Sequence, residues 1–272
     1  MNRKLVLIIC ALYFLSMGAV AKIIEVAPAD ARMTTMIVGG GAPAAAGGAV
    51  EITGLTYTDQ SDSQGASFAV TVPADATAVI VVWATNIATS CTGILSQLNF
   101  DNGSDMDFTQ IIERGRLGDC YRDSTGAYYM TSGSGDWPGA GAKTLYWRFE
   151  TSADYGVNIA AFFVKGINTS SPIVDSDYED NAAAGSFNIA LDGVGSGDMS
   201  VISFFVYDTG TVTLIDADPA GQGQTVIWES TTQSLTMLGT GYEVGDGTVY
   251  GETATSGSDG STVVVAFALN AE

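Results

Sequence analysis

The chain has 272 residues, 30 of them acidic and ten basic, and its net charge of −20 comes with no histidine at all. A surface this acidic repels nucleic acid phosphates and anionic membranes, so we expect neither as a partner. The absence of histidine excludes every Ser-His or Cys-His catalytic arrangement and removes the most frequent metal ligand.

The first 21 residues have the order of a secretory signal peptide. Arg3 and Lys4 make a positive start, residues 5–20 are almost wholly apolar, and the small-residue pattern Ala19-Val20-Ala21 closes the segment. The apolar run is too short for a comfortable membrane span. We therefore expect a secreted or cell-surface protein whose mature chain has no membrane span. Cleavage would remove two basic residues and no acidic ones, which takes the net charge from −20 to −22. An uncleaved anchor is the alternative.

Residues 22–49 are predicted to form a Gly/Ala-rich arm. Residues 39–48 (GGGAPAAAGG) are typical of a flexible linker, and residues 33–38 (MTTMIV) predict a short strand. Such a strand would add to an exposed sheet edge of another subunit, so the arm offers a route to self-association, with a disordered leader as the alternative. Translation from Met33 or Met36 would instead give a cytoplasmic or virion-borne protein.

From residue 50 onward the pattern predicts strand after strand. Phe68, Val70 and Val72 alternate with smaller or polar residues, which indicates a half-buried strand. Four runs are apolar on both faces: residues 78–84, 159–164, 201–207 and 263–269. Weaker strands are predicted at residues 94–100, 143–149, 186–190, 212–215, 225–229 and 237–244. With no helical period and no further linker, residues 50–272 predict one all-β domain, an antiparallel β-sandwich of two sheets around one core.

Cys91 and Cys120 are the two cysteines left once Cys10 departs with the signal peptide. An even pair in an oxidising compartment predicts a disulfide. Closing a loop of roughly 30 residues would stabilise the fold by about 3.5 kcal/mol in the chain-entropy model. Two buried free thiols are the alternative.

Several stretches together resemble a known group of domains. They are VPADATAVIVVWATN, ILSQLNFDNGSDMDFTQI, KTLYWRFETSADYGVNIAAFFVKGINTSSPI, SGDMSVISFFVYDTG and STVVVAFAL, within about residues 66–269. The chain resembles secreted and phage-associated, jelly-roll (lectin-like) β-sandwich domains from environmental bacteria. The resemblance implies a jelly-roll-like fold and an extracellular, structural or adhesive setting. The Gly-rich arm and an apparent Cys-containing insertion at residues 113–136 depart from that pattern.

The apparent insertion is the first candidate binding site. Its arginine and aromatic side chains are Arg114, Arg116, Tyr121, Arg122, Tyr128, Tyr129 and Trp137. Aromatic rings stack on sugars and guanidinium forks bind carboxylates, so we expect a polysaccharide-binding surface here. In the alternative, nearby acids neutralise the arginines and the aromatics cap the edge of the core.

A second candidate site is an acidic loop. Asp101, Asp105 and Asp107 offer oxygen ligands with a glycine for the bend, a composition that suits calcium. An EF-hand is excluded because Ile112 stands where the twelfth-position glutamate belongs. The alternative is an Asn-Gly hairpin tip with solvated aspartates. Residues 175–181 (DSDYEDN) predict another acidic loop with the same two alternatives.

Enzymatic motifs are weak. Asp208-Thr209-Gly210 matches an aspartic protease loop, but that mechanism needs two such aspartates and no second copy occurs. We therefore expect a turn at this position, and no enzyme. The sequence predicts a secreted, non-enzymatic structural or adhesive protein that binds polysaccharide or assembles with itself, with calcium as the one possible cofactor. The alternatives are a virion-surface protein and a glycoside hydrolase or lyase.

Overall fold

The computed structural model of the chain describes residues 49–60, 64–86, 95–115, 123–150, 156–181, 185–207, 211–213, 225–229, 236–245, 247–254 and 262–272. The predicted signal peptide and residues 22–48 of the predicted arm lie outside these ranges, as does the Asp208-Thr209-Gly210 turn. The described residues are all-β, and every pair of neighbouring strands is antiparallel. No helix long and apolar enough to cross a membrane occurs among them.

The first half of the chain forms two sheets. Its strands are β1 (Glu51–Gln60), β2 (Gly65–Val72), β3 (Ala78–Asn86), β4 (Leu95–Asn99), β5 (Thr109–Gly115), β6 (Asp123–Thr131), β7 (Gly141–Phe149) and β8 (Val157–Lys165). A five-stranded sheet has the order β1-β8-β3-β6-β5, and a three-stranded sheet has the order β2-β7-β4.

The second half repeats this arrangement. Its strands are β9 (Ile173–Asn181), β10 (Gly185–Ala190), β11 (Met199–Tyr207), β12 (Thr211–Thr213), β13 (Thr225–Glu229), β14 (Thr236–Val244), β15 (Thr248–Ala254) and β16 (Thr262–Leu269). The sheets are β13-β14-β11-β16-β9 and β10-β15-β12. In each half, the first, eighth, third, sixth and fifth strands make the large sheet, and the second, seventh and fourth make the small one.

A short sequence match supports the repeat. Residues 67–72 read SFAVTV and residues 186–191 read SFNIAL, each in or directly after the second strand of its half. Val70 and Ile189 occupy the same place in the two segments, and both are buried. The two halves are therefore structural repeats, and this short match marks equivalent positions in them.

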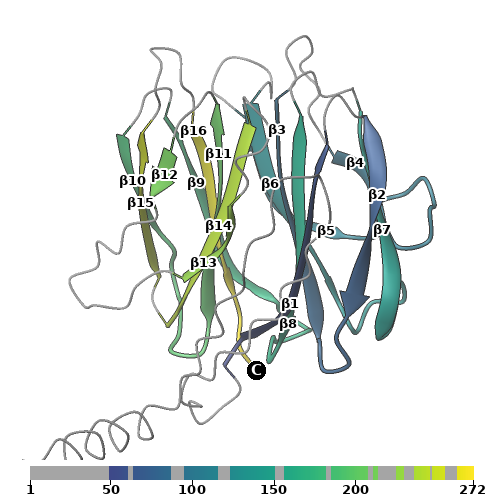
Figure 1. Cartoon of the computed structure of the whole chain (residues 1–272). Helices are drawn as coiled ribbons and strands as arrows, with labels where there is room; N and C mark the ends of the chain where they lie inside the picture. The colour runs from purple at the N-terminus through teal and green to yellow at the C-terminus, as the bar shows by residue number, and fades with distance from the viewer. Residues whose placement is uncertain are drawn as a thin grey trace, which may run out of the picture.

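The four sheets stack as four layers (Figure 1), with the large sheets inside and the small sheets outside. The central apolar cluster lies between the large sheets and includes Phe162 and Phe267. Phe163 and Trp147 belong to the cluster under β2-β7-β4, and Val264 to the one under β10-β15-β12. The expectation of two sheets around one core is therefore wrong, because each large sheet is covered on both faces.

The large sheets pack reciprocally. β6 contacts β11 and β16 of the second half, while β14, the equivalent of β6, contacts β3 and β8 of the first. Two equivalent sheets related by an approximate two-fold axis produce this pattern. Residues 50–272, predicted as one unit, thus contain two halves that share the central cluster.

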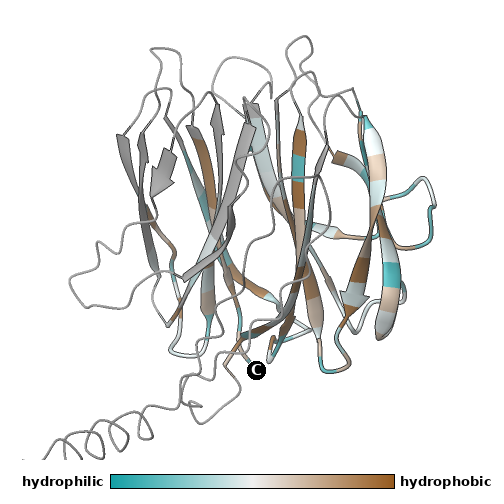
Figure 2. Cartoon of the chain, viewed as in Figure 1, coloured by the Kyte–Doolittle hydropathy of each residue, from teal (hydrophilic) through white to brown (hydrophobic). Residues whose placement is uncertain are grey.

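The strands lie where the sequence predicted them wherever the apolar pattern was strong. From Ala78 to Ala84 every side chain of β3 is fully buried, as its apolar character on both faces predicts. β2 and β7 of the outer sheet instead alternate between buried and exposed residues. In Figure 2 this outer sheet, on the right of the view, shows both apolar and hydrophilic residues.

Three expected loops have a different structure. Residues 113–136 are not an insertion: they include the end of β5 and all of β6, which is an inner strand of its sheet. Residues 175–181 belong to β9, whose apolar partner β16 holds this acidic segment in the sheet. Residues 100–108 are not a hairpin, because they connect β4 of the outer sheet to β5 of the inner one.

Candidate functional site

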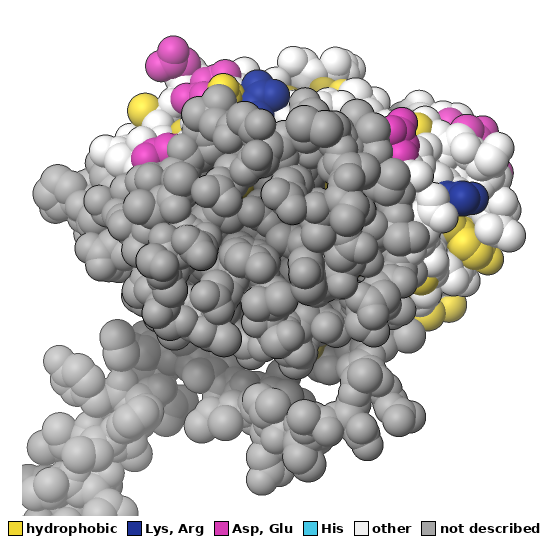
Figure 3. Space-filling model, turned by 90° about the horizontal axis from the view of Figure 1, so that it is seen from above, with side chains coloured by type: hydrophobic (Ala, Val, Ile, Leu, Met, Phe, Trp, Pro, Cys, Tyr) yellow, Lys and Arg dark blue, Asp and Glu magenta, His cyan; other side chains and the backbone are white. Residues whose placement is uncertain are grey.

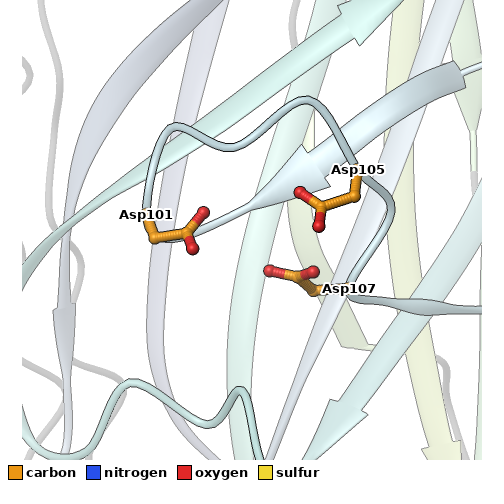
Figure 4. A group of neighbouring side chains, drawn as sticks. All are labelled: Asp101, Asp105 and Asp107. Carbon is orange, nitrogen blue, oxygen red and sulfur yellow. The ribbon is translucent and has the colours of Figure 1, made fainter.

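The connection from β4 to β5 brings three carboxylates together. Asp101, Asp105 and Asp107 each present an oxygen within 4.8 Å of the others, and Figure 4 shows the three side chains pointing toward a common space. Calcium binds oxygen at about 2.3–2.6 Å, so two ligands of one ion stand up to about 5 Å apart. These three carboxylates therefore fit calcium.

The backbone of this loop is built around a glycine. Asn102 has a positive φ of 62°, and the Gly103 N–H donates to Asp101 Oδ1 at 2.8 Å. The Gly103 carbonyl accepts hydrogen bonds from the side-chain amides of Gln97 and Asn99. A Cβ on Gly103 would overlap the Asp105 carboxylate. Glycine is thus required for the carboxylates to approach one another.

The electrostatics of the loop favour a cation. The pKa of Asp107 is raised, first by burial and then by the charges of Asp105, Asp136 and Asp101. A carboxyl that is hard to ionise because of its neighbours gains most from a positive charge among them. Among the described residues, no lysine or arginine forms an ion pair with these three carboxylates.

The described members of the predicted aromatic and arginine surface do not share one face. Arg116, Tyr121, Arg122 and both cysteines of the predicted disulfide, Cys91 and Cys120, lie outside the described residues. The four described members are Arg114, Tyr128, Tyr129 and Trp137. Tyr128 is buried in the outer cluster of the first half, and Trp137 packs against the same cluster from the β6–β7 turn. Tyr129, the next residue along β6, points to the other face and packs against the central cluster. These three rings cap apolar cores, which was the alternative interpretation.

Arg114 and its neighbour Glu113 have local partners. The Arg114 guanidinium lies over the ring of Tyr178, and its Nη1 donates to the Glu113 carbonyl at 3.1 Å. Tyr128 donates its hydroxyl to Glu113 Oε2 at 2.6 Å. Burial raises the pKa of Glu113 to about 7, against the lowering effect of the Tyr128 hydrogen bond.

The outer face of β2-β7-β4 holds a groove that was not predicted. Its volume is about 410 Å³, within the range of about 300–1,000 Å³ that ligand sites occupy. The polar side chains that line it are Gln64, Ser67, Gln97, Asn102, Tyr146 and Arg148. Asn102 belongs to the acidic loop, so the candidate calcium site and the groove adjoin.

Alternation along β7 creates this face. Leu145, Trp147 and Phe149 point into the core, which leaves Tyr146 and Arg148 outside, two residues apart on one side of the sheet. β7 is the middle strand, so its outward side chains have β2 on one side and β4 on the other. The period of two in KTLYWRF was the signal that could have found the site.

Comparison with known proteins adds no assignment. No family model matches the chain, and no curated protein matches it at a significant level. A fold hosts many functions, so function must be argued from the groove and the acidic loop themselves.

Proposed function

We propose that the protein is a secreted, non-enzymatic adhesion or structural protein that binds polysaccharide in the groove of its outer sheet. The single observation that carries this proposal is the lining of the groove. Amides, a hydroxyl and a guanidinium donate and accept hydrogen bonds as sugar hydroxyls require, and the half-buried Tyr146 adds an aromatic ring. All of them except Asn102, which belongs to the acidic loop, stand on strands or at strand ends, which hold them in fixed positions.

Binding is favoured over hydrolysis by what the groove lacks. Glycoside hydrolases use two carboxyl groups about 5–10 Å apart. None of the described residues that line the groove is an aspartate or glutamate. The groove therefore offers recognition groups without the acid pair of a glycosidase.

The strand order adds support from architecture. We propose that each half is a jelly roll, since the order first-eighth-third-sixth beside second-seventh-fourth occurs in both halves. Jelly rolls occur in lectins and in viral capsid proteins. This is an analogy of fold, and it favours a binding or structural role.

Blocking the groove tests the proposal. Ser67 and Thr71 are both exposed and both point outward from β2, but only Ser67 lines the groove. We expect Ser67→Trp to abolish retention of the mature protein by polysaccharide in affinity electrophoresis, and Thr71→Trp to leave it unchanged. The probes are a polyuronate, a neutral β-glucan and soluble chitin. Failure of the wild type to bind any of the three, or equal binding by both variants, contradicts the proposal.

A virion-surface protein is the second candidate, favoured by the tandem eight-stranded halves. The mature N-terminus distinguishes the two. Sequencing of native material should begin at Lys22 for a secreted protein, and at Met33 or Met36 for a virion-borne one.

A further inference from the structure

Arg148 is the one basic residue in the groove. It is exposed on β7, and it makes no hydrogen bond or ion pair through its side chain with any described residue. Other described basic residues are engaged: Lys165 pairs with Glu51 at 3.0 Å and with Asp75 at 3.7 Å, and Arg114 stacks on Tyr178. Lys143 does not line the groove.

A guanidinium with no ion-pair partner among the described residues is unusual in so acidic a protein. With 30 acidic residues against ten basic ones, carboxylates are abundant, and Figure 3, which views the molecule from above, shows more acidic than basic side chains among the described residues. An arginine that has no carboxylate partner among the described residues can bind a carboxylate brought by a ligand. Its planar fork binds such a group through two parallel hydrogen bonds.

β2 and β7 approach each other closely beside Arg148. Gly65 of β2 is the register partner of Arg148. A Cβ at this position would lie 2.7 Å from the Trp147 carbonyl oxygen and 3.0 Å from the Arg148 Cβ. Any other residue would therefore push against β7 at the floor of the groove. Tyr146 lies two residues away on the same face, where a ring can stack on the sugar that bears the carboxylate.

We propose that the groove selects an acidic polysaccharide and that Arg148 binds the carboxylate of a uronic acid residue; this inference rests on the proposed function of the groove. Repulsion from the net charge does not prevent it. The Debye length is about 8 Å at physiological ionic strength, so the distant carboxylates are screened while the direct contact with Arg148 is not.

The described strands of the second half do not repeat the pair Tyr146 and Arg148 at the equivalent register positions. The register of β2 with β7 pairs Ser67 with Tyr146, and the register of β10 with β15 pairs Ser186, the equivalent of Ser67, with Glu252. Glu252 thus occupies the position of Tyr146, and Ala254 that of Arg148. Neither of these two equivalent positions therefore carries an aromatic ring or a guanidinium.

The test compares one polymer in two charge states. Polygalacturonate and the same polymer with its carboxyl groups reduced to alcohols are titrated into the mature wild type, Arg148→Ala, Arg148→Lys and the control Lys143→Ala. We expect the wild type to bind polygalacturonate more tightly than the reduced polymer, by about tenfold to a hundredfold for one charged contact. Arg148→Ala should lose this preference while keeping the weak affinity for the reduced polymer. Arg148→Lys should keep part of the preference for polygalacturonate, and Lys143→Ala should keep all of that preference.

Two results overturn the inference. If the wild type binds both polymers equally, or if Arg148→Ala weakens both by the same factor, Arg148 does not recognise the carboxylate, although the groove still binds polysaccharide. If the wild type binds neither polymer, nor the neutral glucan or chitin, the proposed function fails as well.

Discussion

The guanidinium carbon of Arg114 lies 4.1 Å from the centroid of the Tyr178 ring. Arg114 is on β5 and Tyr178 on β9, so this contact joins edge strands of the two large sheets, one from each half. Tyr178 is 39% exposed, and it is the most exposed large apolar side chain among the described residues. The stacking thus covers part of a ring that the central cluster does not reach.

A double-mutant cycle measures this contact. We predict a coupling free energy of about 0.5–1 kcal/mol between Arg114→Ala and Tyr178→Ala, the usual size of a cation–π contact at an exposed site. Urea denaturation of the four proteins provides the numbers. If the effects of the two substitutions on the free energy of unfolding are strictly additive, the two side chains lie near each other without stabilising one another.

Glu113 predicts a pH dependence of stability. Its side chain is 6% exposed, and burial raises its pKa from 4.5 to about 7. The folded chain therefore binds this proton more tightly than the unfolded chain does, so the stabilisation is complete below pH 4.5 and is lost as the pH rises through 7. The loss amounts to about 3 kcal/mol.

The variant Glu113→Gln isolates this effect, because an amide resembles the protonated acid and still accepts the hydrogen bond from Tyr128. Between pH 5 and pH 8 the free energy of unfolding of the wild type should fall by about 3 kcal/mol more than that of the variant. Parallel pH profiles for the two proteins would contradict the prediction.

Gly126 predicts a steric limit in the core. It pairs with Trp83 across β6 and β3, and a Cβ there would stand 2.9 Å from three atoms of the buried indole. Trp83 is held by an edge-to-face contact with Phe149 at 5.0 Å, so it has no room to move. Gly126→Ala should destabilise the fold by about 1–3 kcal/mol. Gly135→Ala is the matched control, because nothing lies within 4 Å of its added Cβ. If both variants lose a similar free energy of unfolding, the steric explanation is wrong.

Calcium should stabilise the protein through Asp101, Asp105 and Asp107. At a calcium concentration of about 100 times Kd the gain is about 2.7 kcal/mol, which raises Tm by roughly 5–10 °C for a chain of this size. Asp105→Asn should remove most of the increase, whereas Asp192→Asn, an exposed aspartate in the other half, should retain it. An unchanged Tm of the wild type with calcium and with chelator would show that the three carboxylates are only solvated.

Local patterns predicted most strands but few of the connections between them. Residues 225–229 were expected as a strand and are β13. β5, β6 and β9 were missed because turn residues, arginines and acids dominate their sequences, and these strands form because apolar neighbours such as β16 pair with them. Of the predicted binding residues, Tyr128 packs in the outer cluster and Tyr129 packs against the central cluster, on opposite faces of the same sheet, a distinction that depends on register.

The sequence by itself determined that this chain is all-β and that strands such as residues 78–84 are apolar on both faces. Two sheets around one core were nevertheless predicted, although a strand of such a sandwich has only one face to bury. Only the tertiary structure decided that two eight-stranded halves share a central core, and that Tyr146, Arg148 and Gln97 meet on one outer face. The alternation of apolar and polar residues is a property of neighbours along the chain. Register and layering depend instead on contacts between residues far apart in the sequence, and those contacts leave no local signature.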